Sequence, residues 1–213
     1  TFGTAALLCG SYGMCGAEIL AARAALRSGV GLVKAVVCDK NYDAFTASVP
    51  EAVIIPVPTT ESGAPHIYDR MLFSLLSTSN ALLIGCGLGR SEEAINGVLK
   101  TLGKTNIPTV IDADGINALQ GRIDIIRKIN APVVITPHPM EMARICSTTV
   151  DAVQSNRVKY AKKIAIENEC YLVLKGTNTI VATPDGRVFF NTTGNDGLST
   201  GGSGDVLSGM IVS

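Results

Sequence analysis

Short apolar runs alternate with longer amphipathic stretches along most of the chain. The apolar runs predict strands over residues 5–8, 32–37, 53–55, 81–84, 109–111, 133–136 and 171–175. Apolar residues recur at helical spacing over residues 17–27, 68–76, 92–102, 124–129 and 152–168. Nearly continuous apolar runs are typical of strands buried on both faces, so this alternation predicts a parallel sheet with helices on both sides.

The rhythm changes near the end of the chain. Residues 179–183 and 188–190 flank a Pro-Asp-Gly turn, which predicts a β-hairpin. A last helix is expected over residues 205–212. The order of elements indicates an α/β fold, a three-layer α/β/α sandwich with a mostly parallel central sheet, and we expect residues 1–213 to form a single domain.

The composition is that of a globular chain. Hydrophobic residues make up 46% of the chain and charged residues 17%, which excludes a disordered protein. Lys and Arg number 18 and so do Asp and Glu, a balance that argues against a surface for duplex nucleic acid. The apolar runs are too short to span a bilayer, so no membrane segment is expected. No signal peptide opens the chain, and we expect the natural start to lie upstream of Thr1.

The cysteines indicate a reducing compartment. The chain has six cysteines, none in a Cys-x-x-Cys pair, and two histidines, which argues against a zinc site. Several cysteines lie in apolar runs, where a free thiol packs as a small hydrophobe. We therefore expect reduced cysteines and a cytoplasmic protein. The Asn-Thr-Thr sequence at 191–193 is interpreted as a chance match to the glycosylation pattern.

Glycine and polar motifs follow four of the expected strands. They are Gly-Cys-Gly-Leu-Gly at 85–89, Asp-Ala-Asp at 112–114, Thr-Pro-His-Pro at 136–139 and Lys-Gly-Thr at 175–177. The carboxyl ends of the strands form the ligand crevice in an open α/β sheet. The four motifs therefore predict one shared site.

The sequence Thr-Gly-Gly-Ser-Gly-Asp at 200–205 precedes the last helix and is the main candidate for chemistry. Its glycines let the backbone approach a phosphate, and the helix that follows offers unpaired amides. The residues of this anion-binding loop would be Gly201, Gly202, Ser203 and Gly204. Asp205 is placed to act as general base on a substrate hydroxyl. The alternative is a glycine-rich connector in which Asp205 only caps the helix.

A second group of candidate residues would bind a ligand without taking part in the reaction. A nucleotide would meet Lys175, Gly176, Thr177, Asn178 and Thr179 at a strand end. The alternative is a lysine that merely ends a strand in a hairpin. The Gly-rich turn at 85–89 is compatible with close approach of a substrate, and on its own it is weak evidence.

Histidine and carboxylates complete the list of candidates. His138, held between two prolines, is a candidate contact for substrate or phosphate. Glu141 is a candidate partner of this histidine or a ligand of magnesium-bound water. Asp112 and Asp114 alternate in an extended segment and are candidates for magnesium or a polar substrate. The alternative for Asp114 is a cap on the next helix.

The region before the first helix does not match a dinucleotide-binding fingerprint. Glycines at 10, 13 and 16 do not have the Gly-x-Gly-x-x-Gly spacing. This disfavours a hydride-transfer dehydrogenase. A nucleotide-like ligand over Ala17 remains compatible with the sequence.

Together these motifs resemble the ADP/ATP-dependent NAD(P)H-hydrate dehydratase family, a branch of the ribokinase-like superfamily. The resemblance covers nearly the whole chain, and its most specific parts are Thr-Pro-His-Pro-x-Glu at 136–141, Asn-x-Thr-Gly-Asn at 191–195 and the loop at 200–205. It implies that ADP or ATP phosphorylates the S epimer of hydrated NADH or NADPH, after which phosphate is eliminated. The implied cofactor is Mg²⁺, and the implied assembly is a homo-oligomer.

The resemblance also implies roles for single residues. Contacts with the hydrated dinucleotide would come from Ala17, Gly87, His138 and Asp205. The adenine nucleotide would contact residues 175–179 and Gly204. Cys86 stands where the family usually has proline. Family members continue beyond the equivalent of Ser213, so we expect a C-terminally truncated domain that is incomplete at both ends.

Two other functions fit the same residues. A vitamin-precursor kinase of the ribokinase-like superfamily would share the glycine loop and Asp205, and would release a stable phosphorylated product. A truncated domain that binds nucleotide without activity is the second alternative. The sequence does not choose between ADP and ATP, or between the hydrates of NADH and NADPH.

Overall fold

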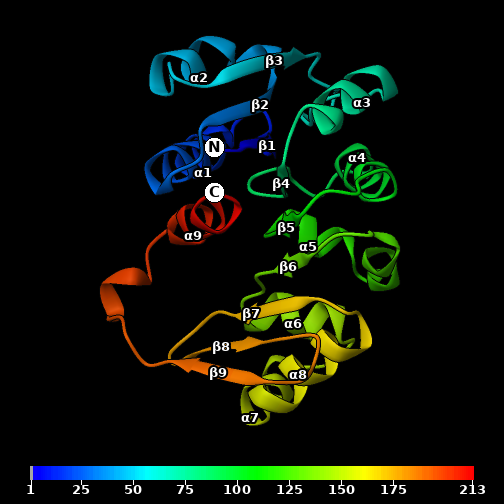
Figure 1. Cartoon of the computed structure of the whole chain (residues 1–213), viewed down its shortest axis with the longest axis vertical. Coiled ribbons are helices and arrows are strands. Elements are labelled where there is room, and N and C mark those ends of the chain that lie inside the picture. Colours follow the sequence, from blue (N-terminus) through cyan, green and yellow to red (C-terminus); the bar gives the residue numbers. More distant parts are fainter. Residues whose placement is uncertain (1) are drawn as a thin grey trace.

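A single sheet runs through the molecule (Figure 1). The computed structural model describes residues 2–213, and within them the sheet has nine strands in the order β3-β2-β1-β4-β5-β6-β7-β8-β9. The strands are β1 (Thr4–Leu8), β2 (Leu32–Cys38), β3 (Val53–Val57), β4 (Ala81–Ile84), β5 (Thr109–Ile111), β6 (Val133–Ile135), β7 (Tyr171–Leu174), β8 (Thr179–Ala182) and β9 (Val188–Asn191). All neighbours from β3 to β7 pair in parallel, whereas β8 and β9 are added antiparallel.

Helices cover both faces of this sheet. The α-helices are α1 (Cys15–Ser28), α2 (Tyr42–Ser48), α3 (Asp69–Ser77), α4 (Glu92–Leu102), α5 (Asp114–Ala118), α6 (Pro139–Ile145), α7 (Val150–Ser155), α8 (Arg157–Glu167) and α9 (Ser203–Val212). Three short 3₁₀ helices are η1 (Asp39–Asn41), η2 (Ile123–Lys128) and η3 (Asp196–Leu198). In Figure 1, α3, α4, α5, α6 and α8 lie on one side of the sheet, and α1 and α9 lie on the other. The predicted α/β/α sandwich is therefore confirmed.

Alternate residues of the strands enter two separate cores. Ala6 and Leu8 of β1 face the core beneath α3–α8. Ala5 and Leu7 face the core beneath α1 and α9. The strand is thus buried on both faces, which explains why its sequence is a continuous apolar run rather than an alternating one.

Two of the sequence predictions about helices were wrong. The single helix expected over residues 152–168 is two helices, because Asn156 leaves the helical region (φ −142°, ψ 43°) between α7 and α8. The helix expected over 124–129 is the 3₁₀ helix η2. Helix α2 was not predicted, because it buries a single large side chain, Phe45, and so has little periodic signal.

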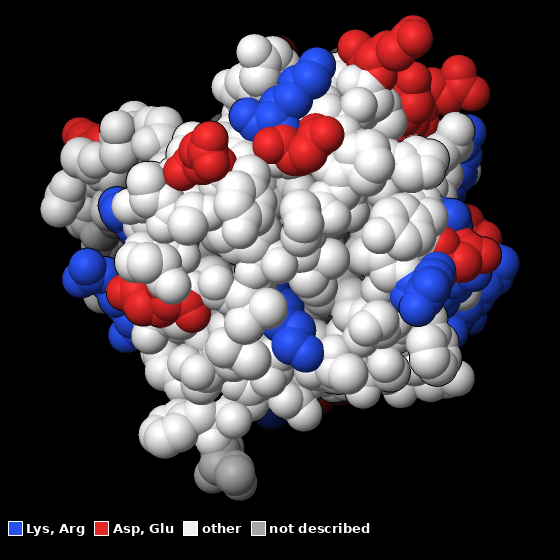
Figure 2. Space-filling view, turned by 90° about the horizontal axis from the view of Figure 1, so that it is seen from above, with Lys and Arg blue, Asp and Glu red and all other residues white. Residues whose placement is uncertain are grey.

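Surface charge is mixed. Figure 2 shows the β3 end of the molecule, where acidic and basic side chains are scattered over a largely uncharged surface. None of the helices in residues 2–213 is both long enough and apolar enough to cross a bilayer. All six cysteines are free thiols, and four of them are buried.

The packing of α9 on α1 brings the end of the chain back to the centre of the sheet. Gly209 is buried in this contact, and a Cβ atom built on it would lie 2.2 Å from the carbonyl oxygen of Ala21. The two helices can therefore approach this closely only because residue 209 has no side chain. The contact fixes α9, and with it Asp205 in the first turn, over β4 and β5.

Gly209→Ala should accordingly destabilise the protein. The added methyl group overlaps backbone rather than a movable side chain, so α9 must shift, and we expect the free energy of unfolding to fall by about 1–3 kcal/mol. Urea unfolding followed by circular dichroism measures this difference. Gly16→Ala is the matched control, because a Cβ atom there meets nothing within 4 Å. Equal stability of the two variants would contradict the close packing of α1 and α9.

Candidate functional site

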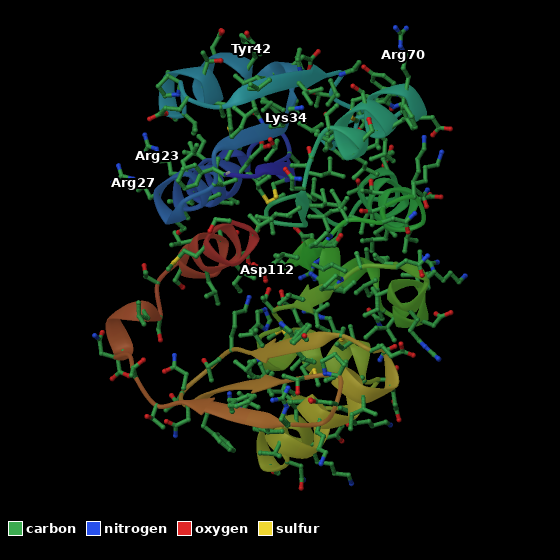
Figure 3. The ribbon with its side chains drawn as sticks, in the orientation of Figure 1. Arg23, Arg27, Lys34, Tyr42, Arg70 and Asp112 are labelled. Atoms are coloured by element: carbon green, nitrogen blue, oxygen red, sulfur yellow. The ribbon has the colours of Figure 1, made fainter. Side chains whose placement is uncertain are left out.

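The predicted motifs meet where the parallel strands end. Residues that follow β4, β5, β6 and β7 converge on the first turns of α9, and Asp112, labelled in Figure 3, lies between the end of β5 and α9. Parallel strands place their carboxyl ends at one edge, so four loops distant in sequence share one region.

Asp112 is the centre of this region. Its side chain is buried, with 1% exposure. Oδ1 accepts hydrogen bonds from Lys175 Nζ and Thr136 Oγ1, both at 2.7 Å. Oδ2 accepts from Ser208 Oγ at 2.7 Å, and the Cys86 thiol lies 3.8 Å away. One carboxylate thus ties together β5, β6, β7 and α9.

The glycine loop leads into α9 through a left-handed residue. Gly202 is the N-cap with φ 89°, a conformation that favours glycine. The Ser203 amide donates to the Thr200 carbonyl, whereas the amides of Gly204 and Asp205 have no acceptor among residues 2–213. The unpaired amide donors therefore lie at the end of the predicted anion-binding loop, where the helix begins.

Asp205 is half-buried beside other charged groups. Burial raises the pKa of its carboxyl, and the negative charges of Asp112 and Asp114 raise it further. A hydrogen bond from Cys86 and the positive charge of Lys175 act in the opposite direction. A carboxylate with a raised pKa is a stronger base than a free aspartate, which suits proton removal from a hydroxyl.

Lys175 lies beneath the start of α9. Its Nζ is 3.4 Å from the position of a Cβ atom built on Gly204. Its ammonium group therefore lies close to the two unpaired amides. This places a fixed positive charge and N–H donors around one point, an arrangement suited to a phosphate group.

The Lys175–Thr179 turn is anchored from behind by Arg157, at the start of α8. The guanidinium group donates to the carbonyl oxygens of Leu174 at 3.2 Å, Lys175 at 3.4 Å and Thr177 at 2.5 Å. The turn contains two left-handed residues, Gly176 (φ 134°) and Asn178 (φ 54°). Sequence reasoning missed this anchor, because Arg157 lies on a helix distant from the motif.

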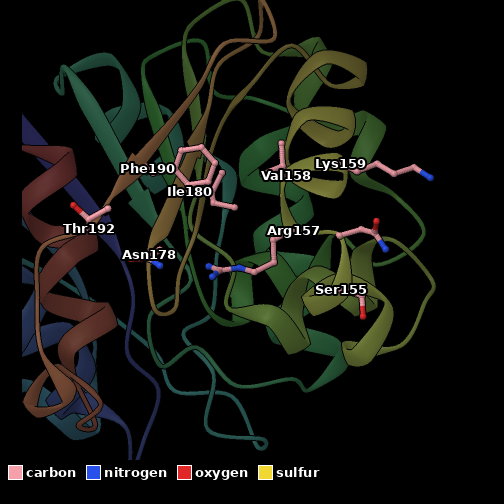
Figure 4. A pocket seen from close by; sticks show the side chains of 9 residues that line it. Ser155, Arg157, Val158, Lys159, Asn178, Ile180, Phe190 and Thr192 are labelled. Carbon is pink, nitrogen blue, oxygen red and sulfur yellow. The ribbon is translucent and has the colours of Figure 1, made fainter.

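A groove lies on the other side of the same turn. Its volume is about 670 Å³, and Figure 4 shows Phe190 and Ile180 of the hairpin facing Val158 and Arg157 of α8. The groove is lined by Ser155, Asn156, Arg157, Val158, Lys159, Asn178, Ile180, Phe190 and Thr192. Asp112 and Asp205 are not among these residues, so the groove is separate from the carboxylate site.

Two glycines allow close contact between the loops after β1 and β4. A Cβ atom on Gly87 would lie 2.8 Å from Ala17 Cβ, so these two predicted contact residues are neighbours. Gly10 lies against Glu18, with 2.5 Å between its Cβ position and Oε2. Glu18 is fully buried without a hydrogen-bond partner in the described part of the chain, and burial raises its pKa well above the ordinary value. The helical pattern did not predict this buried acid.

His138 and Glu141 form a capping box at the start of α6. His138 Nδ1 accepts from the amides of Met140 (3.1 Å) and Glu141 (3.3 Å), and Glu141 Oε2 accepts from the His138 amide (2.8 Å). The side chain of Glu141 is 5% exposed, and burial raises its pKa to about 7. Burial also lowers the pKa of His138. Because Nδ1 accepts from two amides, the ring proton is placed on Nε2, which lies 3.3 Å from Glu141 Oε1.

Asp114 does not act as a helix cap. The N-cap of α5 is Ala113, and Asp114 Oδ2 instead accepts from the Gly89 amide at 2.8 Å. Asp112 and Asp114 thus have different partners and do not share one ligand. Asp114 fixes the glycine turn after β4.

A magnesium ion does not fit the candidate carboxylates directly. Cys86, Asp112 and Asp205 are the one group of three potential ligands that residues 2–213 bring within 4.8 Å. Both oxygens of Asp112 already accept hydrogen bonds, and Lys175 Nζ is 2.7 Å away. Mg²⁺ prefers oxygen to thiol ligands and is commonly held by substrate phosphates. The carboxylate of Glu141 is likewise engaged with His138.

Known proteins resemble this chain in sequence. A family model described as NAD(P)H-hydrate dehydratase matches residues 5–213. The bifunctional NAD(P)H-hydrate repair enzyme Nnr of Moorella thermoacetica is 41% identical over 204 residues, which are 95% of this chain and 38% of that protein. The ADP-dependent (S)-NAD(P)H-hydrate dehydratase of Neisseria meningitidis is 40% identical over 216 residues, covering 99% of this chain and 68% of that protein.

The fold agrees as well. The crystal structure of ADP/ATP-dependent NAD(P)H-hydrate dehydratase from Bacillus subtilis, co-crystallised with ATP/Mg²⁺ and soaked with CoA, superimposes with a TM-score of 0.83 at 34% identity. The match covers 100% of this chain and 73% of that one. The chain spans 38% of the length of the bifunctional relative and 68% of the single-activity relative.

Removal of the Asp112 carboxylate should lower the free energy of unfolding far more than removal of one of its hydrogen-bond donors. Asp112→Ala leaves Lys175 and two hydroxyl groups without an acceptor, and we expect a loss of about 3–5 kcal/mol in the free energy of unfolding. Ser208→Ala, the matched control, removes a single hydrogen bond and should cost about 1 kcal/mol. Urea unfolding of both variants measures the difference. Similar losses would show that Asp112 does not organise the site.

Glu141 should make stability depend on pH. Its pKa of about 7 in the folded state lies above the ordinary value of 4.5, so the folded state keeps a proton that the unfolded state loses. The wild-type free energy of unfolding therefore falls as pH rises between these two values. Glu141→Gln keeps the acceptor for the His138 amide and cannot ionise. Measured by urea unfolding in metal-free buffer, the free energy of unfolding of this variant should fall by roughly 2 kcal/mol less than that of the wild type over this pH range. Parallel plots of the free energy of unfolding against pH for the two proteins would contradict the burial of an ionisable Glu141.

Proposed function

Because the chain belongs to the NAD(P)H-hydrate dehydratase family and has its ribokinase-like fold, we propose that it catalyses the ADP- or ATP-dependent dehydration of the S epimer of hydrated NADH or NADPH. The products are NADH or NADPH, phosphate, and AMP or ADP. The observation that carries this proposal is the placement of Asp205, with its raised pKa, in the first turn of α9 beside Lys175 and two unpaired amides.

In the first step Asp205 removes the proton from the ring hydroxyl of the hydrate. The hydroxyl oxygen attacks the terminal phosphorus of the donor, and the bond to the remaining nucleotide breaks. The amides at the start of α9 and the Lys175 ammonium group stabilise the charge on the transferring group. The product of this step is a phosphate ester on the dihydronicotinamide ring.

The second step uses phosphate as the leaving group. Hydroxide leaves a carbon centre poorly, whereas phosphate leaves readily with the electron pair of the C–O bond. Loss of a proton from the adjacent ring carbon restores the double bond. This pairing of steps accounts for an enzyme that consumes a phosphoryl donor and yet releases an unphosphorylated dinucleotide.

The two ligands take opposite sides of Asp205. The hydrated dinucleotide contacts Ala17 in the first turn of α1, Gly87 in the turn after β4, and His138 in the segment after β6. The donor contacts Gly204 and the Lys175–Thr179 turn, which Arg157 holds in shape. Mg²⁺ would be held by the donor's phosphates and would neutralise part of their charge.

The proposal extends to location and assembly. We propose a cytoplasmic location, which is consistent with six free thiols, and a homo-oligomeric assembly. Small-molecule substrates alone, without nucleic acid or membrane, are the proposed partners. A vitamin-precursor kinase and an inactive nucleotide-binding domain stay as the alternatives that experiment must separate.

Asp205→Asn should separate an enzyme from a binding protein. The direct assay supplies hydrated NADH, ADP and Mg²⁺ and follows the return of the reduced-nicotinamide absorbance. Asparagine cannot accept the hydroxyl proton, so we expect kcat to fall by about 10²–10⁴-fold, while ADP affinity, measured by calorimetry, stays within about threefold because Asp205 lies on the side of the hydroxyl.

Asp151→Asn, on the exposed start of α7, is the matched control and should behave as wild type. Phosphorylation of a vitamin precursor without return of NADH would overturn the dehydratase reading in favour of a kinase. Nucleotide binding with neither reaction would indicate the binding-only alternative. Full turnover by the Asp205→Asn variant would remove Asp205 from the role of base.

A further inference from the structure

Two arginines at the rim of the site are joined by a polar network. Arg90 follows the glycine turn after β4, and its Nε lies 3.4 Å from Asp114 Oδ1. The same oxygen accepts from Asn117 Nδ2 at 3.2 Å, and Asn117 Oδ1 accepts from Arg144 Nη1 at 2.9 Å. Arg90 of one loop and Arg144 of α6 are thereby linked through two side chains of α5.

These arginines lie on the dinucleotide side of the site. The Gly85–Gly89 turn that precedes Arg90 contains Gly87, which touches Ala17. Arg144 is on the helix that His138 caps. Besides burial, the positive charges of Lys175, Arg144 and Arg90 lower the pKa of His138. Three cations, from the loop after β4, the end of β7 and the last turn of α6, therefore act on His138.

Most donors of the two guanidinium groups are free to bind a ligand. Arg90 uses Nε, its side chain is 58% exposed, and its terminal nitrogens have no partner among residues 2–213. Arg144 uses one Nη1 bond to Asn117, and its Nη2 lies 3.0 Å from the Met140 sulfur. A guanidinium group carries five N–H donors. The network thus orients both groups without consuming their hydrogen-bonding capacity.

We propose that Arg90 and Arg144 bind the diphosphate bridge of the hydrated dinucleotide. This inference rests on the proposed function. Lys175 and Gly204 are already assigned to the phosphates of the donor, so the two negative charges of the dinucleotide bridge need other partners. Two oriented guanidinium groups match two linked phosphates through paired N–H···O bonds. Because the bridge is common to NADH and NADPH, the site serves both hydrates equally.

Steady-state kinetics of Arg90→Gln and Arg144→Gln test this assignment. At saturating ADP, we expect each variant to raise the KM for hydrated NADH and for hydrated NADPH by about tenfold or more, since each loses charge-assisted hydrogen bonds. The KM for ADP and kcat should stay within about threefold, because neither arginine reaches the reacting atoms. Arg144→Lys keeps the positive charge but loses the paired N–H donors of the guanidinium group, so it should give a KM for the hydrated dinucleotides between those of the wild type and Arg144→Gln.

Arg70→Gln is the matched control, because Arg70 is exposed on α3 at the far end of the molecule (Figure 3). Its kinetics should equal those of the wild type. Thermal unfolding checks that each variant is folded. A raised salt concentration should weaken dinucleotide binding in the wild type, and much less in a variant that carries both Arg90→Gln and Arg144→Gln.

Direct binding distinguishes this inference from the proposed function. NADH itself carries the same bridge, and its fluorescence should report binding about tenfold weaker in each arginine variant, whether or not turnover occurs. A wild type that binds NADH but does not dehydrate the hydrate overturns the proposed function and leaves the arginine site standing. Unchanged KM and NADH affinity, an effect on NADPH alone, or an effect on ADP alone overturns the arginine site.

Discussion

The buried carboxylate of Asp112 is the interaction on which the site depends. It accepts hydrogen bonds from Lys175, Thr136 and Ser208, which come from two neighbouring strand ends and from the final helix. A buried carboxylate without such partners would be strongly unfavourable. Burial of Asp112 therefore requires these three side chains to stay in place as its donors. Lys175 in turn stands under the start of α9, so the position of its charge follows from Asp112.

The close approach of α9 to α1 makes this arrangement possible. Ser208 can reach Asp112 only if α9 lies deep against the sheet, and Gly209, the next residue, removes the side chain that would keep it away from α1. The first turn of the same helix carries Asp205. The contact between Gly209 and α1, one turn further along the helix, thus sets how closely the carboxylate of Asp205 lies to the strand ends.

The sequence predicted much of the fold, because each central strand is buried on both faces and its apolar run is unbroken. It also predicted which loops meet, since parallel strands place their motifs at one edge. It did not predict Arg157, Ser208 or the Arg90–Arg144 network, because these act through contacts between distant segments and carry no local pattern. Asn156, which splits one expected helix into α7 and α8, interrupts a periodicity that otherwise continues through it.

The two carboxylates of the site lie in different electrostatic surroundings. Asp112 faces an ammonium group and two hydroxyl donors and serves as a fixed acceptor. Asp205 is partly buried and repelled by two other carboxylates, so its pKa rises. A raised pKa makes a carboxylate a stronger proton acceptor, which is what the proposed role of Asp205 as a base requires. Asp112 acts on Asp205 in two ways: its negative charge raises the pKa of Asp205, and its hydrogen bond holds Lys175, whose positive charge lowers that pKa. The pKa of Asp205 thus reflects a balance between burial and repulsion, which raise it, and the hydrogen bond from Cys86 and the attraction of Lys175, which lower it.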